Sequence, residues 1–133
     1  MAQKFKVKPT VGSNVISYTY RVGTKTAPLT DADRGKLVTL GTEGSQAVLG
    51  QAGNQILGVL TSVETHRATQ DGYVIGGVQL VDYAIVDTTG CAIGDFVVIK
   101  EQPAVGTKGL TKVQKSQTYT GWQVHDTNVI MKV

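Results

Sequence analysis

Few residues in this chain are of a type that could carry out chemistry. The only imidazoles are His66 and His125, and the only thiol is Cys91. Glu64 and His66 would lie on one face of a strand. His125 and Asp126 could join them as metal ligands. The chain has no His-x-x-His or Cys-x-x-Cys spacing, however, and isolated histidines are common on protein surfaces. We therefore expect no metal site.

Residue types that occur in catalytic sites are present, but they form no recognisable catalytic motif. A Ser-His-Asp triad could be assembled from Ser62, His66 and Asp71. Such a triad is defined by the geometry of its side chains, however, and not by the presence of the three residue types. The glycine pairs at 41/44 and 50/53 precede no convincing helix, so we interpret them as turns rather than phosphate-binding loops. The sequence predicts no catalytic residue, no cofactor and no enzymatic activity.

The composition is that of one folded domain. The chain has 133 residues, of which 41% are hydrophobic and 17% charged. A chain of this size can bury a core without cross-links. A single cysteine cannot form an internal disulfide, so we expect Cys91 to be a small buried hydrophobe. The 16 glycines indicate many tight turns.

Alternating polar and apolar residues predict strands along most of the chain. In residues 16–22, Tyr18 and Tyr20 share a face with Ile16 and Val22, so we expect both tyrosines in the core. Further strands are predicted over residues 37–40, 55–64, 73–75, 78–87, 96–100, 121–125 and 129–133. Glycine-containing turns separate these segments. The sequence therefore predicts an all-β fold, either a small β-barrel or a β-sandwich with short strands, Gly-rich turns and an extended N-terminal arm. The arm is assigned to residues 1–14 and the single β domain to residues 15–133.

Two short segments could be helical, and two others resemble each other. Thr30 could cap a single turn over residues 30–33, and residues 47–49 could form a short helix. Residues 34–40 and 93–99 share a glycine, then a charged residue, then an apolar strand. Each is predicted to be a turn that leads into a strand. Chance similarity between two turns and an ancient duplication both explain this likeness.

Charge is unevenly distributed along the chain. Residues 1–30 carry five basic side chains and no acidic one, residues 31–99 are acidic, and residues 100–133 are again basic. This pattern favours association with a charged neighbour, including another copy of the chain. The alternative is that these charged side chains are ordinary solvated surface groups. There is no apolar run of membrane-spanning length and no secretory signal, so we expect synthesis in the cytoplasm and no membrane partner.

Single-stranded nucleic acid is the alternative partner for a small basic barrel. The sequence pI is about 9.0, and small β-barrels bind single strands through basic grooves and stacked aromatic rings. Aromatic residues are sparse here, at 6%, and no reader motif is present. We therefore expect nucleic acid not to be the partner.

Three stretches of the sequence resemble a known family. These stretches are residues 27–40 (Ala-Pro-Leu-Thr-Asp-Ala-Asp-Arg-Gly-Lys-Leu-Val-Thr-Leu), residues 47–49 with 56–61, and residues 90–98. Together they resemble the head decoration, or cement, proteins of tailed bacteriophages. The resemblance implies a virion protein made in the host bacterial cytoplasm that binds the outer surface of an assembled head. Its partners would be the major capsid protein and other copies of itself, as a dimer or a trimer.

The resemblance also implies a terminal arm that reaches onto the capsid lattice. The N-terminal residues have the character of such an arm, since lysines alternate with apolar residues. In an extended strand the lysines would point to one side and the apolar side chains to the other. We expect capsid binding by Lys4, Phe5, Lys6, Val7, Lys8 and Pro9. A plain first strand with a solvated lysine edge is the alternative.

Overall fold

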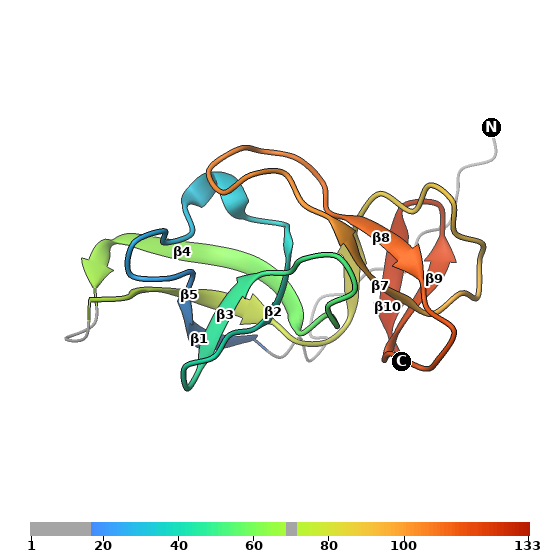
Figure 1. The fold of residues 1–133 in the computed structure, drawn as a ribbon, viewed down its shortest axis with the longest axis horizontal. Coiled ribbons are helices and arrows are strands. Elements are labelled where there is room, and N and C mark those ends of the chain that lie inside the picture. Colours follow the sequence, from blue (N-terminus) through green and yellow to red (C-terminus); the bar gives the residue numbers. More distant parts are fainter. Residues whose placement is uncertain (1–16, 69–71) are drawn as a thin grey trace, which may run out of the picture.

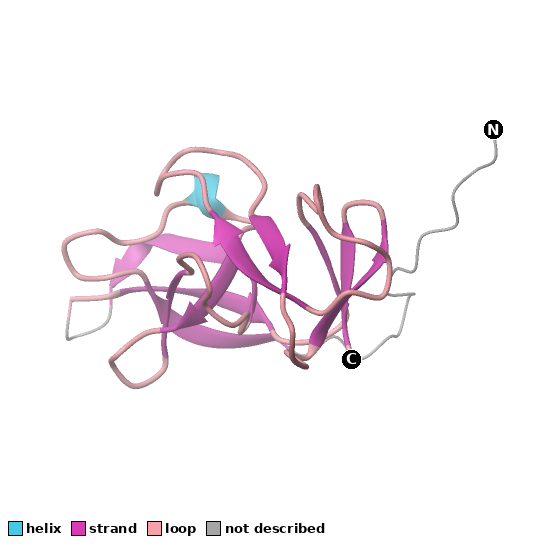
Figure 2. Cartoon of the chain, turned by 45° about the vertical axis from the view of Figure 1, so that its right-hand side comes forward, coloured by secondary structure: helices cyan, strands magenta, loops and turns pink. Residues whose placement is uncertain are grey.

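The computed structural model describes residues 17–68 and 72–133, with residues 65–68 described by their backbone alone. Ten strands and one 3-10 helix, η1 (Asp31–Asp33), form its regular structure (Figure 1, Figure 2). The predicted all-β class is confirmed, with a closed barrel as its largest element. Within the described ranges, no helix has the length and apolar character needed to cross a membrane.

The first five strands close into a barrel. They are β1 (Ser17–Val22), β2 (Leu37–Leu40), β3 (Gln46–Leu49), β4 (Gly58–Ala68) and β5 (Val74–Gln79), in the order β1-β3-β2-β4-β5. β1 pairs antiparallel with β5, Ser17 opposite Gln79, and parallel with β3, Val22 opposite Ala47. Its core consists of apolar side chains from every strand and the first loop: Val22, Leu29, Val38, Ala47, Leu49, Leu60 and Val78.

The last five strands form a second lobe beside this barrel (Figure 1). One sheet contains β6 (Tyr83–Ile85), β10 (Val129–Lys132) and β9 (Trp122–Asp126), and the other contains β7 (Val97–Glu101) and β8 (Lys112–Lys115). Two isolated bridges connect the sheets. Asp87 pairs parallel with Lys112, and Phe96 pairs antiparallel with Gln123.

The second lobe repeats the strand pairings of the first barrel. With the two bridges included, its strands neighbour one another in the order β6-β8-β7-β9-β10 and return to β6. The contact between the first and second strands in this order is parallel, and all the others are antiparallel, as in the barrel. A duplicated unit predicts this agreement, whereas chance similarity between two turns does not.

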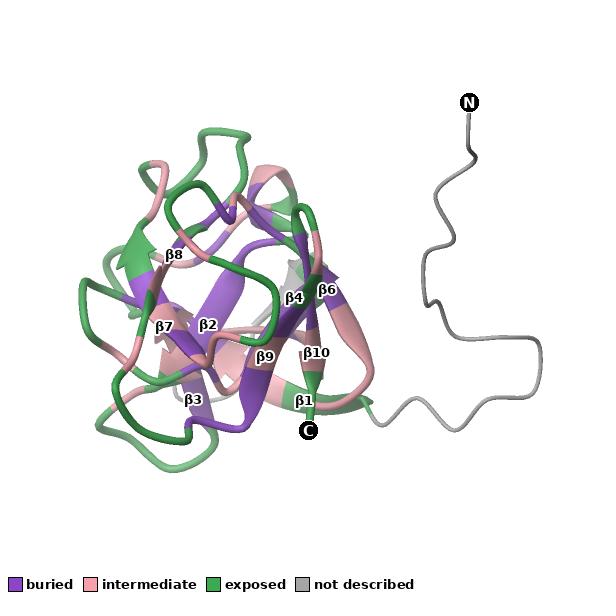
Figure 3. Ribbon diagram, turned by 90° about the vertical axis from the view of Figure 1, so that its right-hand side faces the viewer, coloured by how far each residue is buried: buried purple, intermediate pink, exposed green. Residues whose placement is uncertain are grey.

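The two lobes share a hydrophobic core. Trp122, which is fully buried, lies in one cluster with Val97, Ile99 and Ile130 of the second lobe. The same cluster contains three residues of the first half: Leu37, Ile56 and Val59. Figure 3 shows buried residues along the inner strands and exposed residues in the connecting loops. The lobes are therefore joined by packing as well as by the chain.

The predicted turns are present. The backbone N–H of Asp33 donates to the carbonyl of Thr30 at 2.9 Å, and the N–H of Thr30 donates to Asp33 Oδ2 at 2.8 Å. Thr30 therefore begins the predicted single turn. Gly35 and Gly94, with φ of 90° and 97°, occupy the two similar segments, which lead into β2 and β7.

Several predictions of secondary structure were wrong in the type or the extent of the element. The segment 47–49 is part of strand β3 rather than a helix, because it pairs with both β1 and β2. The predicted strand over 78–87 is interrupted at Asp82, whose φ of 83° breaks the extended chain between β5 and β6. Strand β8 was missed because its sequence Lys-Val-Gln-Lys has one buried apolar residue, Val113.

The prediction that Tyr18 lies in the core was also wrong. Tyr18 is 58% exposed. Tyr20 is partly buried and packs against the barrel core, and Val22 is fully buried. Burial therefore increases along β1 towards its C-terminal end and does not alternate between neighbouring residues.

Candidate functional site

The possible metal ligands are not brought together. Glu64 belongs to the C-terminal part of β4, which lies at the opposite end of the molecule from β9, the strand of His125 and Asp126 (Figure 1). His125 is exposed, and its Nε2 lies 3.2 Å from the side-chain oxygen of Gln123. The His66 side chain lies outside the described part of the chain. Among the described residues, no cluster of three or more His, Cys, Asp or Glu side chains could hold a metal ion.

The possible triad is only partly described. The hydroxyl of Ser62 accepts a hydrogen bond from the backbone N–H of Gly77 at 3.1 Å, across the β4–β5 pair. This hydroxyl therefore supports the hairpin. Asp71 and the side chain of His66 lie outside the described residues, so their placement beside Ser62 remains a hypothesis.

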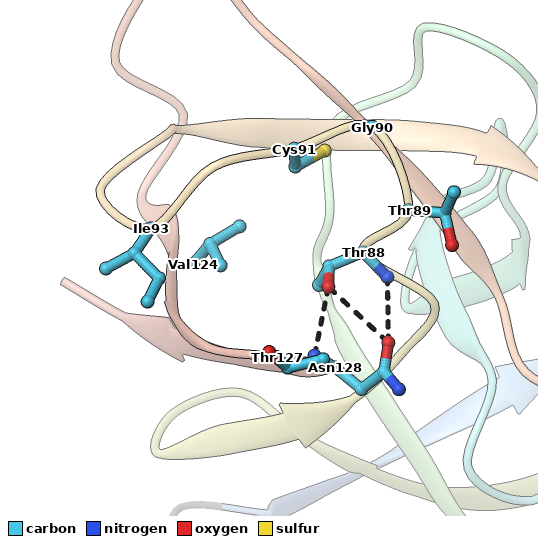
Figure 4. A pocket seen from close by; sticks show the side chains of 8 residues that line it. All are labelled: Thr88, Thr89, Gly90, Cys91, Ile93, Val124, Thr127 and Asn128. Atoms are coloured by element: carbon cyan, nitrogen blue, oxygen red, sulfur yellow. Dashed lines mark hydrogen bonds between the residues drawn. The ribbon is translucent and has the colours of Figure 1, made fainter.

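An open pocket of about 320 Å³ lies in the second lobe, and Figure 4 shows the residues that line it. The turn after β6, strand β9 and the β9–β10 turn surround it. Its lining is half apolar and half hydroxyl or amide: Thr88, Thr89, Gly90, Cys91, Ile93, Val124, Thr127 and Asn128.

Hydrogen bonds fix one wall of this pocket. Asn128, which has a φ of 62°, accepts a hydrogen bond from the Thr88 N–H on its side-chain oxygen at 3.2 Å. Its own N–H donates to the Thr88 hydroxyl at 2.9 Å. Cys91 is partly buried here, and burial raises the pKa of its thiol, to which the nearby Asp95 carboxylate contributes. The thiol therefore stays protonated at neutral pH and is a poor nucleophile.

A buried ion pair fastens the loop between β7 and β8 to the first barrel. Lys36 Nζ lies 2.5 Å from Asp33 Oδ1, and both side chains are fully buried. The ammonium also donates to the carbonyl of Ala104 at 3.0 Å, and Asp33 Oδ1 accepts from the N–H of Gly106 at 2.9 Å. Burial acts to raise the pKa of the Asp33 carboxyl, but the hydrogen bonds from Lys36, Thr30 and Gly106 outweigh it and hold this pKa below its usual range.

The aromatic residues do not form a platform for bases in the described part of the chain. Trp122 is fully buried, and Tyr73 is 8% exposed. The two well-exposed tyrosines lie in different lobes, Tyr18 on β1 and Tyr119 in the loop between β8 and β9. Tyr119 packs edge-on against Phe96, with ring centroids 5.2 Å apart. Stacking of successive bases requires rings arranged in a row along one groove.

The predicted capsid-binding residues, Lys4, Phe5, Lys6, Val7, Lys8 and Pro9, lie outside the described residues. Sequence reasoning missed the pocket and the buried ion pair. A signal for the pair was present, since Asp33 and Lys36 are three residues apart beside a predicted turn. No such signal existed for the pocket, because its residues come from two separate segments.

Comparison with known proteins gave no relatives. No family model matches the chain, and searches of curated proteins and of solved structures gave no significant match.

Proposed function

We propose that this chain is a capsid decoration protein that binds the outer surface of an assembled phage head. It stabilises the head by bridging neighbouring subunits of the major capsid protein. The observation that carries this proposal is the pair of lobes of like topology lying side by side (Figure 1). A protein that bridges two subunits needs two separate contact regions on one rigid body.

Each lobe presents large apolar side chains to solvent, which supports two contact regions. Leu40 of the first barrel is 63% exposed, and Tyr18 lies on the same barrel. Ile93 of the second lobe is 71% exposed, and Tyr119 lies on that lobe. Exposed apolar groups of this kind mark contact sites when a partner covers them.

The stretches that resemble decoration proteins also support the proposal. Residues 27–40 contain η1, Gly35 and β2, and residues 90–98 contain Gly94 and the start of β7. These are corresponding corners of the two lobes. The likeness therefore falls on a repeated structural unit rather than on scattered turns.

The N-terminal arm completes the proposed interface. Phe5 and Val7 fill apolar niches between capsid subunits, while Lys4, Lys6 and Lys8 meet acidic surface. Copies of the protein associate as dimers or trimers, so that many weak arms act together on one lattice.

Co-sedimentation with empty capsids tests this proposal. We expect the full chain to pellet with capsids and a variant lacking residues 2–9 to bind much more weakly. The truncated variant should melt close to the full chain, because terminal residues seldom contribute to a core. Equal capsid binding by the folded truncated protein would place the interface elsewhere. A full chain that stays in the supernatant, yet binds single-stranded oligonucleotides with a steep dependence on salt, would favour the nucleic-acid alternative.

A further inference from the structure

A second groove, of about 290 Å³, lies between the two lobes. Its mainly apolar lining comes from the first barrel, from β6 and from the loop between β7 and β8. Ile85 on β6 is 40% exposed and Leu110 in the loop is 47% exposed, so the apolar surface of this groove reaches solvent. The lining includes Gly35, Val59, Gln79, Ala84, Ile85 and Leu110.

One edge of β6 is not paired. The other edge pairs with β10, and just beyond β6 the N–H of Val86 donates to the carbonyl of Asn128 on that side at 3.1 Å. Successive residues of a strand direct their N–H and C=O groups to opposite edges, so those of Ile85 point away from β10. In the described part of the chain, no hydrogen bond reaches the N–H or the C=O of Ile85.

The unpaired edge faces the groove because β6 and the chain before β8 diverge. The N–H of Asp87 donates to the carbonyl of Thr111 at 2.9 Å, and the N–H of Val113 donates to the carbonyl of Asp87 at 3.1 Å. Ile85 lies two residues before Asp87 and faces the same side. At that level Ile85 and Leu110 both line the groove. An open strand edge beside an apolar groove accepts an extended peptide, whose backbone supplies N–H and C=O groups at the matching spacing.

The chain itself contains a segment of matching pattern. Residues 4–8, Lys-Phe-Lys-Val-Lys, alternate lysine with an apolar residue, so in an extended strand Phe5 and Val7 would share one side. The segment precedes Ser17, which pairs with Gln79, a lining residue of the groove. An extended chain from Ser17 back to residue 8 spans up to about 30 Å, so the segment can reach the groove.

We propose that residues 4–8 dock in this groove of their own chain in the free protein, as a strand added to the open edge of β6. Phe5 and Val7 enter the apolar groove, the main chain pairs with Ile85, and the three lysines face solvent. The same residues are proposed above to contact the capsid, so the groove holds them until they transfer to the shell. The docking itself does not depend on the capsid role.

Amide hydrogen exchange, followed by NMR on the full chain without capsids, tests the main-chain pairing. The double variant Phe5→Ser with Val7→Ser keeps the length and charge of the segment and removes its apolar side chains. We expect the Ile85 N–H to exchange about tenfold more slowly in the wild type, because a tethered segment has an effective concentration of about 1 mM, ten times a dissociation constant on the order of 0.1 mM. The Val86 N–H, bonded to Asn128, is the control and should exchange equally in both proteins. Equal exchange of Ile85 in both would overturn the proposal.

A synthetic peptide of residues 2–10, capped at both ends, identifies the occupant. Added to the double variant, it should give saturable NMR shifts at the methyls of Val59 and Leu110, with a dissociation constant on the order of 0.1 mM. The wild type should bind the peptide about tenfold more weakly, because its own segment competes. The same peptide with serine in place of Phe5 and Val7 should give no saturable shift. No saturation with the first peptide, or equal affinity for the wild type and the double variant, would overturn the proposal.

Two loop substitutions in the double variant locate the binding surface. Leu110→Ser should weaken peptide binding at least about fivefold. Val105→Ser is the matched control, because Val105 is 45% exposed in the same loop but does not line this groove, and binding should stay unchanged. An equal effect of both substitutions would refute the assignment. The competition by the wild-type segment should not change on dilution of the protein. Competition that fades on dilution would assign the groove to the segment of a second copy and overturn docking within one chain.

Discussion

Replacing the buried Lys36 by methionine should destabilise the protein severely. Methionine matches the length of the aliphatic stem, so the change removes the charge with little change in packing. The Asp33 carboxylate would stay buried without its cation, and the carbonyls of Pro103 and Ala104 would lose their donor. Breaking a buried ion pair on one side costs about 3–5 kcal/mol, because the remaining charge is uncompensated.

The expected loss can be measured by urea unfolding. Trp122 is the only tryptophan and is fully buried in the shared core, so its fluorescence reports the loss of that core. Asp33→Asn should cost a similar amount. The double variant should cost at least about 2 kcal/mol less than the sum of the single changes, because neither charge is then left alone. A loss below about 1 kcal/mol for Lys36→Met would refute this account of the pair.

The pH dependence of this loss has a definite sign. In the native protein the pKa of Asp33 is lowered from its unfolded value, near 3.8. The ion pair therefore contributes its full stability above the unfolded pKa. This contribution is lost as pH falls through the folded pKa. In Lys36→Met the lowering hydrogen bond from the lysine is gone, and burial should raise the pKa of Asp33 above its usual range. The variant should therefore approach the wild type in stability as pH falls from 7 towards 4. A difference that grows over this range would contradict the assignment.

Three further changes should separate steric, backbone and polar effects on stability, each measured by the same unfolding experiment. Gly76→Ala should lower the free energy of unfolding by at least about 2 kcal/mol, since its Cβ would lie 2.3 Å from the backbone oxygen of Ser62. The control Gly44→Ala, with open space around the new Cβ, should stay within about 0.5 kcal/mol of wild type. Asn128→Ala should cost about 2 kcal/mol and Asn128→Gly less, because glycine tolerates the φ of 62° but both lose the side-chain hydrogen bond. Trp122→Phe should cost about 1–2 kcal/mol, a small loss for so large a side chain, because the indole N–H finds no protein acceptor in the described structure.

The fold class could be predicted from the sequence because the features that indicate it are local. Period-two alternation and glycine turns recur within a few residues, and they located most of the strands. The pairing of β1 with β5 joins Ser17 to Gln79, and nothing in the neighbourhood of either residue specifies that partner. The exposure of Tyr18 could not be predicted for the same reason, since it depends on where β1 lies relative to the end of the barrel.

The candidate site was less accessible to sequence reasoning. The pocket combines Thr88 and Cys91 with Val124, more than thirty residues apart along the chain. The similar segments around Gly35 and Gly94 were visible as a pattern. The structure shows that they occupy corresponding places, because the N–H of Gly35 donates to the carbonyl of Leu60 on β4 and the N–H of Gly94 donates to the carbonyl of Val124 on β9. The predicted arm, residues 4–9, lies outside the described residues and remains a prediction.

The shared core has a consequence for the order of events during synthesis. The first barrel can close as soon as β5 has left the ribosome, because all of its strand partners have then been made. Leu37, Ile56 and Val59 pack in a cluster whose other members belong to the second lobe. A nascent chain that ends before β7 therefore carries a closed barrel with an uncovered apolar end. Such surfaces promote aggregation of incomplete chains, so the interval between the two halves is when a chaperone would be needed most.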